Sequence, residues 1–166
     1  MAGVEVIRFN TRGTSSEAGT SDGAFGEGVT EKFDVEAAIE FAFDELGVER
    51  LWILGWSFGT DLALKFARDS RVKGLILLSP PLRTSEVSDL DFWAKDGRPI
   101  TAIIPEFDDY LKPEDAAVAF QVVPQIKLIY VKDAKHLWVG EPSVYRVLSE
   151  ITEILSPQSL PLPTEI

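Results

Sequence analysis

Residues 51–64, LWILGWSFGTDLAL, decide the fold of this 166-residue chain. An apolar run of strand length leads into Gly-Trp-Ser-Phe-Gly and then into a helical pattern. A serine between two glycines at such a junction is typical of a nucleophile elbow, a strained turn that exposes the Ser57 hydroxyl above a sheet. We expect a side chain at Gly55 or Gly59 to collide with the crowded backbone. The alternative is that Ser57 only caps the helix.

Other apolar, β-branched runs have the same length and alternate with helical patterns. The predicted strands are residues 4–9, 50–56, 72–78, 100–105 and 126–131. One helix is expected from Thr30 to Gly47, with Phe33, Ala37, Phe41 and Phe43 on its apolar side. Further helices are expected after Ser57, from Pro113 and from Pro142. Strands joined by helical crossovers form parallel sheets that are covered on both faces. The prediction is therefore an α/β fold with a mostly parallel sheet of about five strands.

Composition excludes several classes of function. The net charge of −11 opposes binding to nucleic acid or to anionic membranes, and the absence of cysteine excludes disulfides and thiolate metal sites. No apolar run approaches the roughly 20 residues of a membrane helix, and the N-terminus lacks the layout of a signal peptide. We expect a soluble, cytoplasmic protein without nucleic-acid or membrane partners.

A base and a carboxylate for Ser57 follow later strands. His136 is the single histidine and comes after the last predicted strand, while Asp108 and Asp109 follow the preceding one. Polar groups at the carboxyl ends of parallel strands meet in one crevice. A serine hydroxyl needs a base, and the imidazole needs a carboxylate to orient it, which gives the chain order Ser57, Asp108, His136. We favour Asp108 over Asp109, with a lone surface histidine and a solvated acidic loop as the alternatives.

These residues together resemble the α/β-hydrolase superfamily over residues 4–155. RFNTRGTSSEAG, GEGVTEKFDVEAAIEFA and the K-H-x-x-x-G around His136 are similar to small bacterial serine hydrolases with an R-F-N-x-R-G loop. The resemblance implies that Ser57 is the nucleophile, His136 the general base and then acid, and Asp108 the orienting carboxylate. The Phe58 N–H, at a helix N-terminus, is expected to stabilise the oxyanion. The implied reaction is cleavage of a small ester, thioester or related acyl bond, with no metal or organic cofactor.

The chain departs from the family in two places. Pro105 stands where the family often has glycine, at the end of the strand before Asp108. Counterparts of the first three strands, and of the loop with the second oxyanion N–H, are absent, so the fold is expected to be N-terminally truncated. Three explanations remain open. Met1 is internal to a longer gene, or residues 4–9 pair directly with residues 50–56. The third is that another chain supplies the missing strand, or that two copies pair through the exposed sheet edges as a homo-oligomer.

We expect one domain over residues 1–156 with a short lid near residues 80–97, and a disordered tail at residues 157–166. Substrate-binding residues stay unassigned. Several aromatic residues line a pocket or belong to the core, namely Trp56, Phe58, Phe92, Trp93 and Trp138. Two roles are open for Arg8, Asn10 and Arg12: they bind an anionic group of the substrate, or they pair with local acidic residues and cap the loop. An acyltransferase and a non-catalytic binding or scaffold module are the alternatives to a hydrolase.

Overall fold

A parallel sheet of four strands forms the centre of the computed structural model, which describes residues 3–16 and 19–163. Its order is β3 (Leu51–Trp56), β4 (Val72–Leu78), β5 (Ile100–Phe107) and β6 (Ile126–Lys135). All three pairings are parallel, and one row crosses the sheet through Gly55, Leu77, Ala102 and Leu128. The prediction of an α/β fold with a parallel sheet is confirmed.

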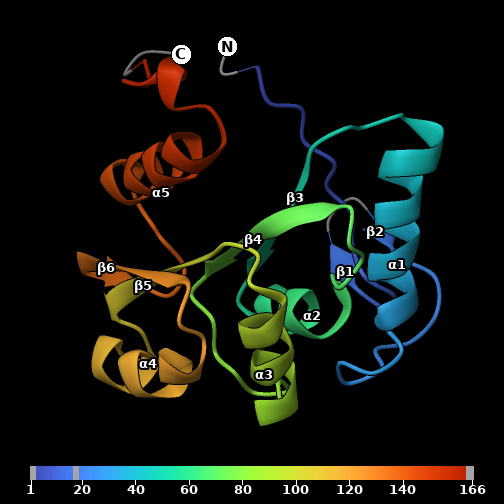
Figure 1. Cartoon of the computed structure of the whole chain (residues 1–166), viewed down its shortest axis with the longest axis horizontal. Coiled ribbons are helices and arrows are strands. Elements are labelled where there is room, and N and C mark those ends of the chain that lie inside the picture. Colours follow the sequence, from blue (N-terminus) through green and yellow to red (C-terminus); the bar gives the residue numbers. More distant parts are fainter. Residues whose placement is uncertain (1–2, 17–18, 164–166) are drawn as a thin grey trace.

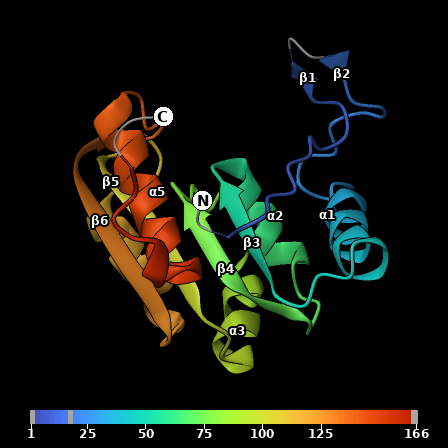
Figure 2. The same cartoon turned by 90° about the horizontal axis from the view of Figure 1, so that it is seen from above.

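Helices cover both faces of this sheet (Figures 1 and 2). The helix α5 (Glu141–Leu155) lies on one face, whereas α2 (Phe58–Phe66), α3 (Val87–Asp96) and α4 (Pro113–Ala119) lie on the other. The remaining elements are α1 (Lys32–Glu40), its π-helical continuation η1 (Phe41–Glu45), the short turns η2 (Phe120–Val122) and η3 (Pro157–Ser159), and the two-residue strands β1 (Ser15–Ser16) and β2 (Gly19–Thr20).

Strand β4 separates two hydrophobic cores. Leu75 and Leu77 point into the larger core with α1 to α4, while Ile76 and Leu78 point into a smaller one under α5. Because both faces of β4 are covered, its sequence is apolar from Gly74 to Leu78 and does not alternate there. This covered sheet is the rigid support for the loops that follow each strand.

Residues 4–9 do not form the predicted strand. They run as an exposed, extended segment outside the sheet, and Val6 is 82% exposed. An apolar, β-branched pattern predicts a strand only where the segment has a neighbour to pair with and a face to bury. Among the described residues, no strand pairs with the outer edge of β3. A homo-oligomer through that edge stays a prediction.

Helix α1 turns a different face to the core than the sequence suggested. Of the predicted apolar side, Phe33, Ala37 and Phe41 are exposed and only Phe43 packs against the core. The buried residues are Val35, Ile39 and Ala42. The helix carries two apolar stripes, and packing against α2 selects between them. Gly47, with φ of 65°, ends the helical stretch as predicted, since glycine adopts the left-handed region without strain.

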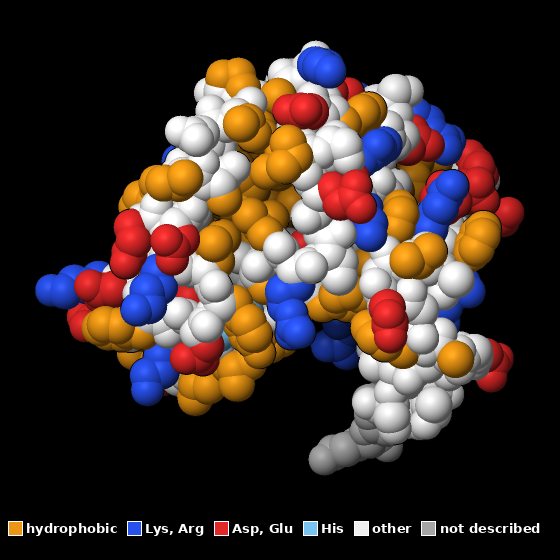
Figure 3. Space-filling view, turned by 90° about the horizontal axis from the view of Figure 1, so that it is seen from below, with side chains coloured by type: hydrophobic (Ala, Val, Ile, Leu, Met, Phe, Trp, Pro, Cys, Tyr) orange, Lys and Arg blue, Asp and Glu red, His pale blue; other side chains and the backbone are white. Residues whose placement is uncertain are grey.

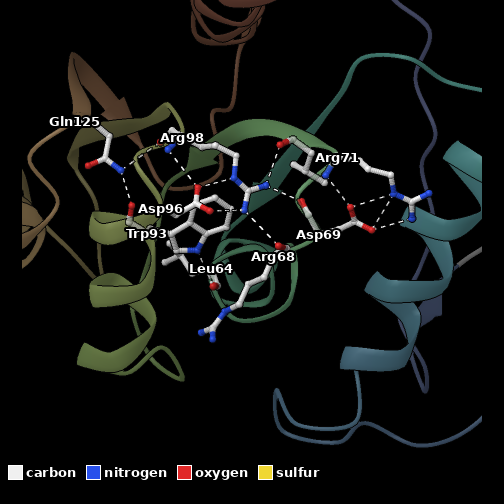
Figure 4. A network of polar contacts seen from close by, with 9 residues as sticks. Leu64, Arg68, Asp69, Arg71, Trp93, Asp96, Arg98 and Gln125 are labelled. Atoms are coloured by element: carbon white, nitrogen blue, oxygen red, sulfur yellow. Dashed lines mark hydrogen bonds and ion pairs between the residues drawn. The ribbon is translucent and has the colours of Figure 1, made fainter.

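Arg98 ties the amino ends of β4 and β5 together (Figure 4). Its guanidinium donates to the carbonyls of Asp69 and Val72 at 2.6 and 2.9 Å, and to that of Arg68 at 3.3 Å. It also pairs with Asp96 and lowers the pKa of that carboxyl by hydrogen bonding. Three carbonyls at and just before the start of β4 thus share one donor group, and that of Asp69 also accepts from the Val72 N–H at 3.1 Å.

Two segments differ in character from the expectation. The predicted lid at residues 80–97 contains α3, whose Leu90 and Trp93 belong to the larger core. The tail contains η3, and Tyr145 donates to the carbonyl of Leu162 at 3.0 Å; residues 164–166 lie outside the described residues. No helix in the described ranges is long and apolar enough to cross a membrane.

Candidate active site

Ser57 lies on a strained turn between β3 and α2. Its backbone has φ of 51° and ψ of −123°, and its N–H donates to the Leu78 carbonyl at 2.9 Å, so the turn continues the pairing of β3 with β4. The Ser57 carbonyl accepts from the N–H and the hydroxyl of Thr60 at 2.8 and 2.7 Å. A non-glycine residue held at positive φ is costly, and such strain is typical of functional turns.

The two glycines of the motif have different roles. A Cβ on Gly55 would lie 2.3 Å from the Gly59 carbonyl oxygen, so the first glycine is required by the turn, as predicted. A Cβ on Gly59 would meet nothing within 4 Å, and the prediction of a collision there is wrong. The reason is that Gly59 lies in the first turn of α2 with its α-carbon facing open space, while Gly55 lies under that turn.

Helix α2 begins at Phe58, directly after the serine. Within the described part of the chain, the Phe58 N–H has no hydrogen-bond acceptor. A free N–H at a helix N-terminus is polarised by the helix dipole and attracts negative charge. The Phe58 N–H is thus available to an oxygen atom beside Ser57.

His136 and Asp108 lie next to Ser57. The Oγ of Ser57 is 2.8 Å from Nε2 of His136, and Nδ1 of His136 is 2.9 Å from the carboxylate of Asp108. An ionised carboxylate only accepts hydrogen bonds, so Nδ1 carries the proton and Nε2 accepts from the serine hydroxyl. The structure thus brings together the three side chains that the sequence picks out.

Strand β5 determines which acidic residue faces His136. The strand continues past Pro105, which pairs with Val131, and ends at Phe107. Asp108 then turns inward, is nearly buried, and accepts from the N–H groups of Tyr110 and Leu111 at 2.8 and 3.2 Å. Asp109 is exposed. Proline in place of glycine therefore does not disturb the register of the carboxylate.

The backbone of His136 is held by Ser79, which the sequence did not single out, and by Trp56, which was expected only to line a pocket or the core. The His136 carbonyl accepts from the hydroxyl of Ser79 at 3.2 Å and from the indole N–H of Trp56 at 3.3 Å. The indole N–H of Trp138 donates to the Ser79 hydroxyl at 2.8 Å. The signal was present, because Ser79 directly follows β4 at the same edge of the sheet.

Several of the other candidate residues pack in the cores or form ion pairs away from Ser57. Trp93 and Trp138 are buried in the two cores, and Arg12 pairs with Asp34 at 2.9 Å. Phe58 is partly buried and contacts Phe25 edge to face, with ring centroids 5.5 Å apart. The ring of Tyr110 lies edge to face against the imidazole of His136, at 4.7 Å between centroids. Phe58 and Tyr110 therefore flank the serine and the histidine.

Charge is mixed over the surface that Figure 3 shows, where acidic and basic side chains alternate around apolar ones. In the described ranges, no group of three or more His, Asp or Glu side chains is placed to hold a metal ion.

Comparison with known proteins agrees with this architecture. A family model described as alpha/beta hydrolase fold matches residues 2–128. No curated protein matches the chain. Among solved structures, an alpha-beta serine hydrolase homologue from Coxiella burnetii is 22% identical with a TM-score of 0.68, covering 91% of this chain and 67% of its own.

Two further structures are similar in fold. A serine hydrolase without a lid from Xanthomonas campestris is 24% identical with a TM-score of 0.67, over 94% of this chain and 67% of that one. An esterase from Pyrococcus furiosus is 18% identical with a TM-score of 0.65, over 85% of this chain and 66% of that one. The chain therefore spans about two thirds of the length of these structures.

Proposed function

Because this chain belongs to the alpha/beta hydrolase fold family, we propose that it is a serine hydrolase acting on a small ester, thioester or related acyl bond through an acyl-enzyme. One observation carries the proposal: Ser57, His136 and Asp108 form a continuous line of two short hydrogen bonds. A hydroxyl, an imidazole and a buried carboxylate in this order are the components that activate a serine.

In the proposed reaction, Ser57 Oγ attacks the acyl carbon while His136 Nε2 takes its proton. Asp108 keeps the Nδ1 proton in place and stabilises the imidazolium that forms. The Phe58 N–H, at the start of α2, donates to the oxyanion. His136 then returns the proton to the leaving group, and a water molecule, activated by the same imidazole, releases the acid. No step calls for a metal or an organic cofactor.

The rate is expected to depend on a second oxyanion donor. The removal of one such donor costs about 10²–10³ in rate. If the Phe58 N–H is one donor, the second must come from another segment. A protein whose site has only one donor would be a slow enzyme or a non-catalytic binding module. An acyltransferase would use the same three residues with an alcohol, amine or thiol acceptor in place of water.

A fluorophosphonate probe tests the proposal. The wild-type protein should be labelled once, with the label mapped to Ser57, because the probe reacts only with an activated serine. The Ser57→Ala variant should be unlabelled, while Ser88→Ala, which changes an exposed serine, should be labelled as the wild type. A folded wild-type protein that takes no label would contradict the hydrolase and favour the binding module. Product analysis with p-nitrophenyl acetate and an added alcohol distinguishes hydrolysis from acyl transfer.

A further inference from the structure

We infer that Ser79 is a positioning residue for His136: its hydroxyl joins the indole of Trp138 to the histidine's backbone carbonyl and so fixes the imidazole against Ser57. This inference rests on the proposed function and adds to it a residue outside the three that activate the serine.

Ser79 occupies a second strained junction of the same sheet. It follows β4 as Ser57 follows β3, its φ is also 51°, and its N–H continues the pairing by donating to the Ile103 carbonyl at 2.9 Å. Unlike Ser57, Ser79 is fully buried. A buried hydroxyl on an unfavourable backbone persists where its hydrogen bonds define the surrounding structure.

The hydrogen bonds of Ser79 have one consistent direction. Trp138 Nε1 can only donate, so the Ser79 oxygen accepts from it at 2.8 Å. The hydroxyl proton is then left for the His136 carbonyl, 3.2 Å away. Trp138 is two residues beyond His136, and its backbone N–H donates to the Lys135 carbonyl at 3.0 Å, which closes a turn. Ser79 therefore holds the histidine loop at two points of the same turn.

The Ser79 hydrogen bond anchors the His136 backbone to the end of β4, the strand that pairs with the one before Ser57. Asp108 orients the imidazole ring, but it lies on the loop after β5. Ser79 instead fixes the main chain of His136 from the end of β4, whose Leu78 carbonyl also accepts from the Ser57 N–H. The two sides of the Ser57–His136 hydrogen bond are thus built on adjacent residues, Leu78 and Ser79.

Removal of the Ser79 hydroxyl should move the imidazole. Without it, the Trp138 N–H is buried with no acceptor, and the His136 carbonyl keeps only the 3.3 Å bond from Trp56. A displacement of about 1 Å at a reacting group is sufficient for a loss of about 100-fold in rate. Because Ser79 is fully buried and so out of reach of a substrate, substrate binding should be much less affected.

The kinetic test uses Ser79→Ala and Ser79→Gly. We expect kcat for p-nitrophenyl acetate to fall about 10- to 100-fold in both, with KM within about twofold of the wild type. Glycine tolerates φ of 51°, so this variant separates the hydroxyl from the backbone strain. Ser88→Ala, on the exposed side of α3, is the matched control and should keep its kcat. Full kcat in a folded Ser79→Gly variant would overturn the inference.

The second test reads the imidazole directly and does not depend on activity. His136 is the only histidine, so every imidazole signal in a ¹H–¹⁵N NMR spectrum belongs to it. The Nδ1 proton bonded to Asp108 should give a downfield signal in the wild type and in Ser88→Ala, and it should shift upfield or broaden in Ser79→Ala. Unchanged imidazole signals in folded Ser79→Ala would overturn the inference. If the signals change but the wild type takes no fluorophosphonate label, the proposed hydrolase fails and the positioning role of Ser79 stands.

Discussion

At the scale of single residues, the elbow is built from one indispensable glycine and one dispensable glycine. Gly55 lies under the first turn of α2, where a Cβ would come within 2.6 Å of both the Gly59 carbonyl oxygen and the Thr60 nitrogen. Backbone atoms cannot yield as the end of a flexible side chain can. Gly59 faces open space from the same helix. The motif therefore contains one position set by sterics and one that packing leaves free.

The two glycines make a matched pair for mutation. Gly55→Ala should destabilise the protein by about 1–3 kcal/mol or more, as overpacking of a rigid site does. Gly59→Ala should be neutral or stabilise it by up to about 1 kcal/mol, because alanine is the better helix former. Urea unfolding followed by circular dichroism measures both. Equal losses of stability in the two variants would contradict the asymmetry.

The rate of the proposed reaction should depend on the protonation of His136. Its Nε2 must be unprotonated to accept from Ser57, so kcat/KM should fall as the pH is lowered from about 8 to 5. Steady-state kinetics with a neutral ester checks this, with circular dichroism at each pH to show that the fold persists. A flat profile over this range would argue against a histidine base.

The sequence was sufficient to find Ser57, Asp108 and His136 as neighbours, because each follows a strand and parallel strands end at one edge. It was not sufficient to find the hydrogen bonds that hold the His136 carbonyl. Ser79 follows a strand too, but its role depends on the direction in which two indole N–H groups point, and tertiary packing alone sets that direction.

At the scale of elements, the sequence identified helices and strands better than it identified their buried sides. The strands at β3 to β6 were found because each is a short apolar, β-branched run of strand length, and those at β3 and β4 are near-continuous, as is typical of buried parallel strands. The buried face of α1 was missed, because the sequence of the helix has two apolar stripes of similar hydrophobicity. Only packing against α2 determines which of them is buried. Residues 4–9 were missed for a related reason, because their strand-like pattern has no partner to pair with among the described residues.

Arg98 provides a test of how β4 and β5 are joined. Arg98→Lys removes the planar fork that serves the carbonyls of Arg68, Asp69 and Val72, and should lower the free energy of unfolding by about 2–3 kcal/mol. Arg146→Lys, in an exposed pair with Glu150 on α5, is the control and should change it by less than about 0.5 kcal/mol. Urea unfolding decides, and a loss in Arg98→Lys no larger than in the control would show that the fork is unimportant.

At the scale of the whole molecule, three arginine–aspartate pairs connect stability to pH. The pKa of Asp34 lies below its ordinary 3.8 because Arg12 hydrogen-bonds to it, and Arg71 and Arg98 lower the pKa of Asp69 and Asp96 in the same way. At pH values near the ordinary pKa, the unfolded chain therefore binds protons that the folded chain does not. The stability from these pairs is complete above that pH and is lost as the pH falls through the lowered values.

Arg12→Gln tests this linkage. The variant should be less stable than the wild type at pH 7, and the difference should shrink as the pH falls to 3, because protonated Asp34 no longer needs the guanidinium. Lys32→Gln, which breaks the exposed pair with Glu36, is the control and should have little effect at either pH. Urea midpoints at pH 7, 5 and 3 give the comparison. A difference that stays constant with pH would exclude Asp34 as its source.

The hydrogen bonds of Arg98 to the Asp69 and Val72 carbonyls lie at the amino ends of the strands, whereas Ser57, Asp108 and His136 follow their carboxyl ends. The length of a strand thus separates the residues that hold the sheet together from those proposed to react. Such a separation favours laboratory evolution: substitutions that raise heat tolerance can accumulate at one end while selection for new substrates works at the other. Trade-offs between robustness and turnover should then concentrate at the few positions, such as Gly55, where scaffold and reaction centre share the same atoms.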